Sequence, residues 1–439
     1  MKNDRKNKIV CPSPTCIHCP SRCHRQQDHP PSRDEALEVL FAEVEFTLEM
    51  EFVALKESLG RVTAEETYAA FPVPVADGAQ HDGIMVNWEQ VKTLLNKGYQ
   101  VLEKREFCLC AMGNVLISPF DTVIPSEQVR YLPDGRAEIL ALPGKGQGIV
   151  KKGNSIRAGE RLLPENCRLV PAHLSILRLA GVERVPVWKK PQVAVIPVGM
   201  DTVPPGCRPG AGQTVEADSI LIESIIKECG GEAWTEPVAE DSEALISQAI
   251  SSVISHCDCL VLIGGLGRNG ARYGDYTGEA VARLGRVLVH GMEFGPGGKP
   301  MLLGEIGGKC VVGIPAPPHA ALTQAEQYLP AVMGRFLHCP CYERQEIEVN
   351  LPIDGQRPLR PSYHPHVGLK WTEAGYEMVP IRMGDTVDCF VNATGIVTAW
   401  EEESQPERAG KARVQLLYGE ETIRRLSCRL ATEVSMRKQ

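Results

Sequence analysis

Residues 72–86 read Pro72-Val-Pro-Val-Ala-Asp77-Gly-Ala-Gln-His-Asp82-Gly-Ile-Met-Val86 and are the most informative stretch of this sequence. Proline fixes its own φ and favours extended geometry in the residue before it, so the Pro-x-Pro entry is stiff. Each aspartate precedes a glycine, a pair typical of tight turns. The pattern predicts a rigid loop with two carboxylates, one of which could hold a cation or polarise a substrate. An isolated Asp-Gly is more often a simple turn between strands.

The same stretch resembles the Pro-x-Phe-Asp-Asn-Ser-Ala-Met-Asp-Gly signature of the molybdopterin molybdenumtransferases, with Asp77 and Asp82 on its two aspartates. Further motifs follow that family's order from about residue 32 to 431. The resemblance implies insertion of molybdate or tungstate into adenylylated molybdopterin, with release of AMP. It also implies Mg²⁺ and a homodimer in which the Asp77 loop of one subunit completes the site of the other.

Composition narrows the function classes. The 439 residues carry a net charge of −8, which argues against a nucleic-acid binder. No apolar run approaches the roughly 18 residues of a membrane span, so none is expected. The N-terminus is polar and basic and lacks the apolar segment of a secretion signal, so we expect a cytoplasmic protein.

The chain length and the alternation of element types predict an α/β multi-domain protein. Ser32 and Glu35 form a capping-box pattern at the start of a helix, and a second helix is predicted at Val53–Leu59. With the resemblance, we expect a Cys-rich N-terminal extension (1–30), a helical linker domain (31–74 and 156–190), an inserted β-rich domain (75–155), an α/β molybdopterin-binding domain (191–338) and a small C-terminal β-barrel (343–431).

The 191–338 region alternates apolar runs with helical stretches. Strands are predicted at 192–197, 259–263 and 311–314, and helices at 218–228 and 320–336. Such alternation favours a mostly parallel sheet with helices on both faces, and ligands of such sheets bind outside the carboxyl ends of the strands.

Three loops leave such strand ends and could bind an anionic pterin. Backbone N–H groups, helix N-termini and Arg or Lys suit phosphate and oxyanions, although a glycine cluster alone is more often a plain turn. The glycine-rich loop (264–276), the lysine loop (295–300) and the proline loop (313–319) resemble family motifs in order. The substrate-binding candidates they supply are Gly264, Gly265, Arg268, Arg272, Tyr276, Lys299, Pro315 and Pro318.

Carboxylates complete the candidate site, because Mg²⁺ takes one or two carboxylates together with phosphate oxygens and water. The resemblance assigns metal and adenylate handling to Asp77, Asp82, Asp201, Glu240 and Asp275. Asp201 stands where the family carries a longer glutamate. Glu240 is followed by Asp241, and this pair stands where the family has two aspartates.

The N-terminal extension contains Cys11, Cys16, Cys19 and Cys23 in a C-x4-C-x2-C-x3-C pattern with histidines nearby. Four thiolates in 13 residues can close a tetrahedral zinc site or hold an iron–sulphur cluster. Zinc is the first expectation, since Cys and His both suit it. The alternative is a disordered tail with incidental cysteines.

A second function fits the same sequence. A non-catalytic protein could use the cleft to bind or deliver a pterin cofactor, with the Cys-rich tail holding a metal or sensing redox state. A molybdoenzyme or a chaperone would then be its partner. Release of AMP from adenylylated molybdopterin separates this alternative from the transferase.

Overall fold

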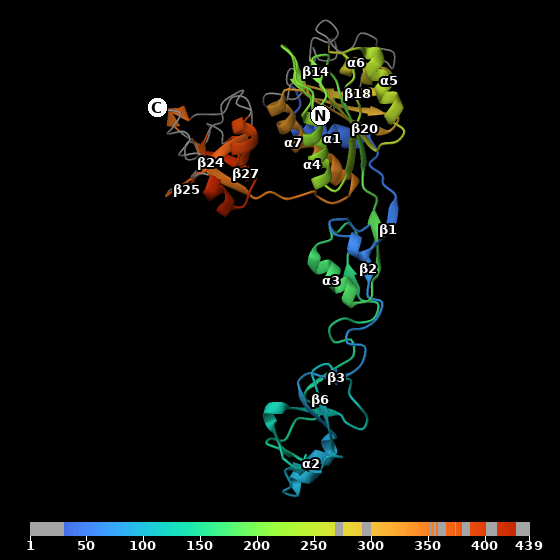
Figure 1. Ribbon diagram of the computed structural model, residues 1–439, viewed down its shortest axis with the longest axis vertical. Coiled ribbons are helices and arrows are strands. Elements are labelled where there is room, and N and C mark those ends of the chain that lie inside the picture. The colour runs from blue at the N-terminus through green and yellow to red at the C-terminus, as the bar shows by residue number, and fades with distance from the viewer. Residues whose placement is uncertain are drawn as a thin grey trace, which may run out of the picture. The chain divides into compact units, whose positions relative to one another are not determined.

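The computed structural model describes residues 30–267, 275–291, 300–351, 353–354, 357–358, 366–373, 375–379, 387–400 and 411–426. The chain divides into two compact units (Figure 1). Residues 1–48 and 190–439 form the larger unit, and residues 49–189 form the smaller one.

One part of the smaller unit packs a helix beside short antiparallel strand pairs. β1 pairs with β12 and β2 pairs with β11, and both pairs are antiparallel. Leu55, Leu163, Leu177 and Val185 are buried in its core. The bounds are β1 (Met50–Ala54), a 3₁₀ turn (Leu55–Glu57), β2 (Thr67–Tyr68), β11 (Arg161–Leu163), α3 (Pro171–Leu179) and β12 (Arg184–Trp188).

The helix predicted at Val53–Leu59 is wrong. Val53 and Ala54 belong to β1 and pair with Val185 and Arg184 of β12, and the Leu55 N–H donates to Glu183 O at 2.9 Å. Seven residues gain little as an isolated helix, so strand pairing with a segment 130 residues away decides their conformation.

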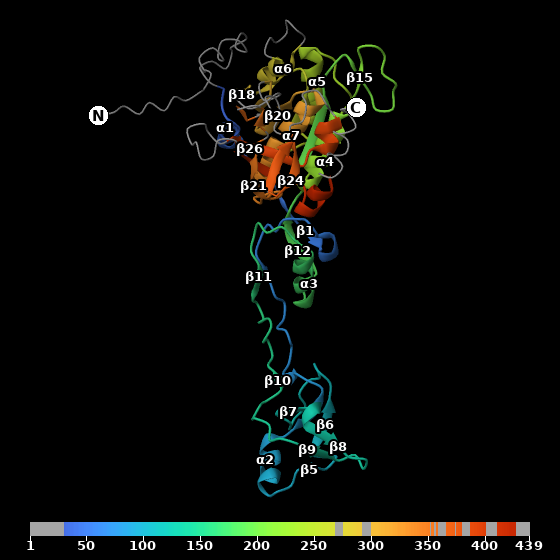
Figure 2. The same cartoon turned by 90° about the vertical axis from the view of Figure 1, so that its left-hand side faces the viewer.

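The rest of the smaller unit is β-rich (Figure 2). Two three-stranded antiparallel sheets have the orders β6-β4-β7 and β5-β9-β8, and β3 pairs with β10. The bounds are β3 (Gly78–Ala79), β4 (Gly83–Val86), α2 (Trp88–Asn96), β5 (Val101–Leu102), β6 (Phe107–Cys110), β7 (Thr122–Pro125), a 3₁₀ turn (Ser126–Gln128), β8 (Val129–Tyr131), β9 (Ala137–Ile139) and β10 (Ile149–Val150).

The larger unit contains a six-stranded sheet of order β16-β13-β17-β20-β19-β18. β16, β13, β17 and β20 are mutually parallel, whereas β19 and β18 continue the sheet antiparallel. The sheet is therefore mostly parallel, as predicted. The bounds are β13 (Gln192–Pro197), β16 (Glu232–Thr235), β17 (Cys259–Ile263), β18 (Arg286–His290), β19 (Leu302–Ile306) and β20 (Lys309–Ile314).

Helices cover both faces of this sheet. Alternate residues of a strand point to opposite faces. Val195 packs with α1, α4 and α7, while its neighbour Ile196 packs with α5 and α6. The bounds are α1 (Arg33–Glu43), β14 (Thr202–Val203), β15 (Thr214–Val215), α4 (Asp218–Glu228), α5 (Glu243–Val253), α6 (Thr277–Leu284) and α7 (Pro318–Phe336).

Helix α1 begins at the predicted capping box, with Ser32 as its N-cap. Its buried residues Ala36, Leu37 and Leu40 join the core of the larger unit. Five strands near the C-terminus form a closed barrel of order β21-β25-β24-β26-β27, in which β27 pairs back with β21. The remaining bounds are β21 (Glu346–Asn350), β22 (Ile353–Asp354), β23 (Arg357–Pro358), β24 (His366–Thr372), β25 (Gly375–Val379), a π-helical turn (Asp388–Asn392), β26 (Gly395–Trp400) and β27 (Lys411–Leu416).

Candidate active site

The carboxyl ends of the parallel strands lie side by side. The Val198 N–H donates to Ile263 O at 2.8 Å, and the Gly264 N–H donates to Ile314 O at 2.9 Å. The loops after β13, β17 and β20 therefore begin next to one another. Ligands of open α/β sheets bind at this edge, which makes it the candidate active site of the larger unit.

The glycine loop after β17 approaches its neighbours too closely for side chains. Gly264 and Gly265 have φ of +93° and +63°. A Cβ on Gly264 would lie 2.5 Å from Val198 O, and one on Gly265 would lie 2.4 Å from Thr277 Oγ1. Thr277 also donates through Oγ1 to Gly264 O at 2.9 Å. Glycine is thus required for both the turn and the packing at these predicted positions.

Asp275 lies against the same loop. A Cβ on Gly267 would come 2.0 Å from Asp275 Oδ2, so the carboxylate covers the Gly267 Cα. Tyr276 follows as the N-cap of α6. The predicted residues Arg268 and Arg272 lie outside the described residues.

Two acidic turns meet at the end of β13. The Gly199 N–H donates to Ala239 O at 3.0 Å, and Asp241 Oδ2 accepts from the Met200 N–H at 2.9 Å. This contact brings the turn that carries Asp201 beside the turn that carries Glu240. Both predicted carboxylates belong to exposed residues.

Asp241 lies at the candidate site, although the predicted set omits it. The acidic pair Glu240-Asp241 is visible in the sequence, but the pattern does not say which member turns toward residue 200. Asp241 Oδ2 holds the Met200 backbone, which leaves the exposed Glu240 at the surface.

The proline loop leads from β20 into α7. Pro315 is buried, whereas Pro318 is exposed and is the first residue of α7. Proline is favoured at the first helical position because its missing N–H would have no partner there. The N-terminus of this 19-residue helix thus lies beside the glycine loop, since Ala316 contacts the Gly264 position. The predicted Lys299 lies outside the described residues.

The two aspartates of residues 72–86 lie in the smaller unit and bind its backbone. Asp77 Oδ2 accepts from Lys151 Nζ, and Oδ1 accepts from the Lys152 N–H, both at 2.8 Å. The hydrogen bond from Lys151 and then that from Lys152 lower the pKa of Asp77. Asp82 Oδ1 accepts from the Met112 N–H at 2.7 Å. Both carboxylates therefore stabilise turns of their own unit.

Among the described residues, no group of three or more His, Cys, Asp or Glu side chains could hold a metal ion. Cys11, Cys16, Cys19 and Cys23 lie outside the described residues. No helix within the described ranges has the length and apolar character needed to cross a membrane.

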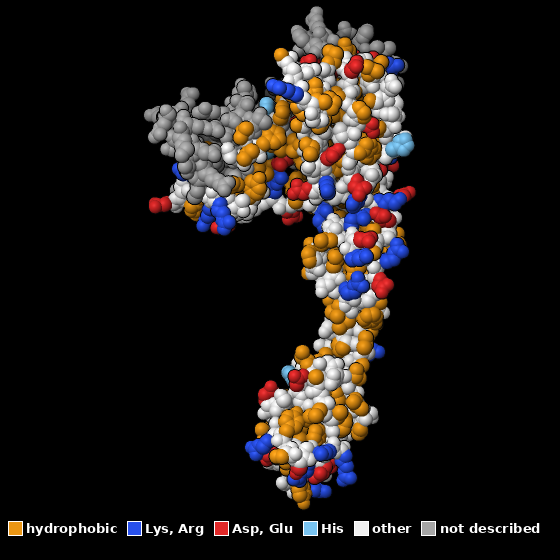
Figure 3. Space-filling view, in the orientation of Figure 1, with side chains coloured by type: hydrophobic (Ala, Val, Ile, Leu, Met, Phe, Trp, Pro, Cys, Tyr) orange, Lys and Arg blue, Asp and Glu red, His pale blue; other side chains and the backbone are white. Residues whose placement is uncertain are grey.

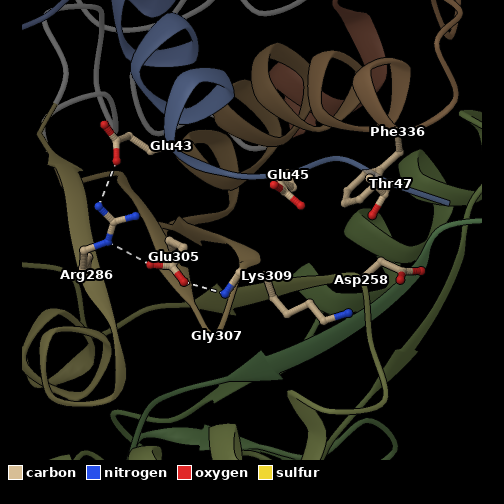
Figure 4. Close-up of a pocket in the computed structure, with 10 residues that line it drawn as sticks. Glu43, Glu45, Thr47, Asp258, Arg286, Glu305, Gly307, Lys309 and Phe336 are labelled. Atoms are coloured by element: carbon tan, nitrogen blue, oxygen red, sulfur yellow. Dashed lines mark hydrogen bonds and ion pairs between the residues drawn. The ribbon is translucent and has the colours of Figure 1, made fainter.

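A cavity of about 430 Å³ lies at the opposite, amino-terminal edge of the sheet, and charged side chains line it (Figure 4). Arg286 donates to Glu43 Oε2 at 2.8 Å and to Glu305 Oε2 at 2.9 Å. Lys309 and Asp258 stand at the starts of neighbouring strands in its wall. None of the predicted site residues lines this cavity.

Two protein-family models match consecutive parts of the chain. The model described as "MoeA N-terminal region (domain I and II)" matches residues 31–181. The model described as "Probable molybdopterin binding domain" matches residues 194–334. Together they extend over both the smaller unit and the sheet of the larger unit.

Curated relatives agree with these matches. A molybdopterin molybdenumtransferase of Nostoc sp. is 25% identical over 353 residues, which cover 75% of this chain and 80% of the relative. A molybdopterin molybdenumtransferase of Haemophilus influenzae is 23% identical over 314 residues, which cover 69% and 77%.

Solved structures share the fold. A molybdopterin biosynthesis MoeA protein from Pyrococcus horikoshii has a TM-score of 0.72 at 26% identity, covering 89% of this chain and 100% of that chain. A second structure from this organism has a TM-score of 0.69 at 20% identity and covers 88% and 100%. The two consecutive family models, the curated relatives and this shared α/β multi-domain fold show that the chain belongs to the MoeA family.

Proposed function

We propose that this chain inserts molybdate into adenylylated molybdopterin and releases AMP. The observation that carries the proposal is the gathering of three kinds of group at one sheet edge. They are the close-packed glycines 264–265, the Asp275 carboxylate and the acidic turns at residues 199–201 and 240–241. Curated relatives of this chain are molybdopterin molybdenumtransferases.

The glycine loop would hold phosphate groups of the substrate. The turn at Gly264 and Gly265 carries no side chain of its own, and an anion beside the N-terminus of α7 gains from the helix dipole. Arg268, Arg272 and Lys299 would add positive charge, and Tyr276 would contact the pterin or the adenylate. Molybdate is the proposed substrate oxyanion, and tungstate is the alternative to supply in the same AMP-release assay.

The acidic turns fit Mg²⁺ by their donor chemistry. Magnesium in phosphoryl sites takes one or two protein carboxylates, with phosphate oxygens and water supplying the rest. Asp201 and Glu240 are exposed residues on turns that Asp241 holds together, and Asp275 lies on the adjacent glycine loop. One or two of these carboxylates would hold the ion together with phosphate oxygens of the substrate, and the ion would supply charge neutralisation at the phosphoanhydride.

Replacing Asp275 by Asn tests the assignment. Asparagine keeps the size of the side chain but replaces the charged carboxylate with a neutral amide, so we expect AMP release to fall about tenfold or more with little change in melting temperature. Asp134→Asn, at an exposed turn of the smaller unit, is the matched control. Equal AMP release by Asp275→Asn and the parent would exclude the role. No AMP release by the parent would instead favour the pterin-delivery alternative.

We further propose a homodimer in which the Asp77 loop of one subunit serves the glycine loop of the other. Apolar side chains are exposed over the smaller unit (Figure 3), among them Leu109, Met112 and Ile117. Exposed apolar patches mark interaction surfaces.

Mixed dimers test this proposal. Asp77→Asn keeps an oxygen acceptor for the Lys152 N–H but loses the charge. Mixing Asp77→Asn subunits with Asp275→Asn subunits should raise AMP release above that of either variant alone, because some dimers then carry one intact site. A monomer at micromolar concentration in sedimentation, or no restoration in the mixture, would rule the arrangement out.

The finer parts of the expected organisation remain proposals. These are the five-part domain division, a metal centre in residues 11–23, a molybdoenzyme or chaperone that receives the product, and a cytoplasmic location.

A further inference from the structure

A histidine ties the glycine loop to the end of a strand on the far side of the sheet. His290 is the last residue of β18, and its Nε2 lies 3.1 Å from Leu266 O. A carbonyl oxygen only accepts hydrogen bonds, so the proton of this contact belongs to the imidazole Nε2. The ring also lies over the first turn of α6, because a Cβ on Gly278 would come 3.4 Å from His290 Cε1.

The residue that His290 holds is itself anchored in the core. Leu266 is 3% exposed. A Cβ on Gly313 would come 3.0 Å from Leu266 Cδ2, so this side chain packs directly on the backbone of β20. Leu266 therefore joins the glycine loop to β20 two residues before Pro315, and its carbonyl joins the loop to β18. The contacts of His290 and Leu266 connect the strands that precede the lysine loop and the proline loop.

We propose that His290 is a positioning residue for the glycine loop. By donating to Leu266 O, it fixes the backbone of residues 264–267 before the ligand arrives. A loop ordered in advance binds more tightly, because its ordering entropy is not lost on binding. The effect of His290 on substrate affinity rests on the proposed function, in which the glycine loop holds the phosphates of the substrate. His290 itself touches no substrate in this proposal.

The decisive comparison is between two replacements. His290→Gln places an amide N–H at the end of an arm long enough to imitate Nε2. His290→Leu has similar bulk but no donor, and so leaves Leu266 O without its side-chain partner. We expect the amides of residues 264–267 and Thr277 to exchange hydrogen faster in His290→Leu, and at near-parent rates in His290→Gln.

Substrate kinetics give the second readout. Losing one hydrogen bond that orders the loop should raise the KM for adenylylated molybdopterin about three- to tenfold in His290→Leu. The kcat should change less, because the reacting groups keep their identity. His290→Gln should recover most of the affinity. His256→Leu, at an exposed histidine after α5, is the matched control for loss of an imidazole.

Hydrogen exchange needs no turnover, so the positioning role is tested even if the parent releases no AMP. In that case the proposed function fails while the exchange result still decides about His290. Unchanged exchange at residues 264–267 in a folded His290→Leu protein would overturn the inference. If that variant does not fold, His290→Asn carries the same amide on a shorter arm, and exchange equal to that of His290→Gln would overturn it instead.

Discussion

Gly264→Ala tests how closely the ends of β17 and β13 approach. Gly264 has a φ of +93°, and an added Cβ would stand 2.5 Å from Val198 O, which is backbone and cannot rotate away. Alanine in left-handed geometry costs about 1–2 kcal/mol, and overpacking at a fixed neighbour adds about 1–3 kcal/mol. We therefore expect a loss of about 2–5 kcal/mol in the stability of the sheet.

Gly212→Ala is the matched control for this prediction. Gly212 has a similar φ of +82°, but nothing lies within 4 Å of an added Cβ. Only the conformational cost of about 1–2 kcal/mol applies there. Hydrogen exchange of peptides containing residues 193–198 and 259–263 reports the opening free energy of the strands concerned. Equal opening free energies in the two variants would refute the close approach at Gly264.

Three further predictions concern other parts of the chain. Burial and then Glu216 raise the pKa of Asp218 to about 7. The unfolded carboxyl releases its proton near pH 4, so the parent should lose stability as the pH rises from about 4 to about 7. Asp218→Asn should lose less stability than the parent between melts at pH 5 and at pH 8. Asp82→Ala removes the acceptor of the Met112 N–H, so this amide should exchange about tenfold faster, whereas unchanged exchange would contradict the contact. Anaerobically purified protein should carry one zinc or one iron–sulphur centre in residues 11–23, lost when their cysteines become serine; freely alkylated thiols and no metal would contradict this.

The elements best predicted from sequence are those with a clear apolar pattern. β13 and β17 have the predicted bounds because their continuous apolar residues face two covering layers. Helix α4 also has the predicted bounds, because its periodic apolar residues pack on one side against the core of the larger unit. Helix α7 begins two residues before the prediction, since Pro318 can occupy the first helical position.

The elements that could not be predicted from sequence depend on partners far along the chain. β1 exists because it pairs with β12, and no local pattern in residues 53–59 encodes that partner. β18 and β19 run antiparallel at the edge of the sheet. The direction of β19 relative to β20 follows from the turn at Gly307-Gly308, and strand periodicity alone does not report direction.

Sequence predicts which loops form the candidate site better than it predicts which side chains make contacts there. Motif order and strand ends located the glycine loop, the proline loop and the acidic turns at one sheet edge. Sequence could not rank Glu240 against Asp241, because the backbone turn decides which carboxylate reaches the Met200 N–H. It also gave no sign of His290, whose contact joins residues 24 positions apart.

The environment of Asp77 constrains any chemistry assigned to it. Its two carboxylate oxygens already accept from Lys151 and Lys152, and these bonds keep its pKa low. The Asp77 side chain is nevertheless 37% exposed, and that of Lys151 is 68% exposed. A cation that binds Asp77 must therefore displace or share with the Lys151 ammonium, whereas an anionic substrate would meet that ammonium directly. Asp77 consequently acts on an incoming ligand as one half of an ion pair, and its effect on substrate depends on Lys151 as much as on its own charge.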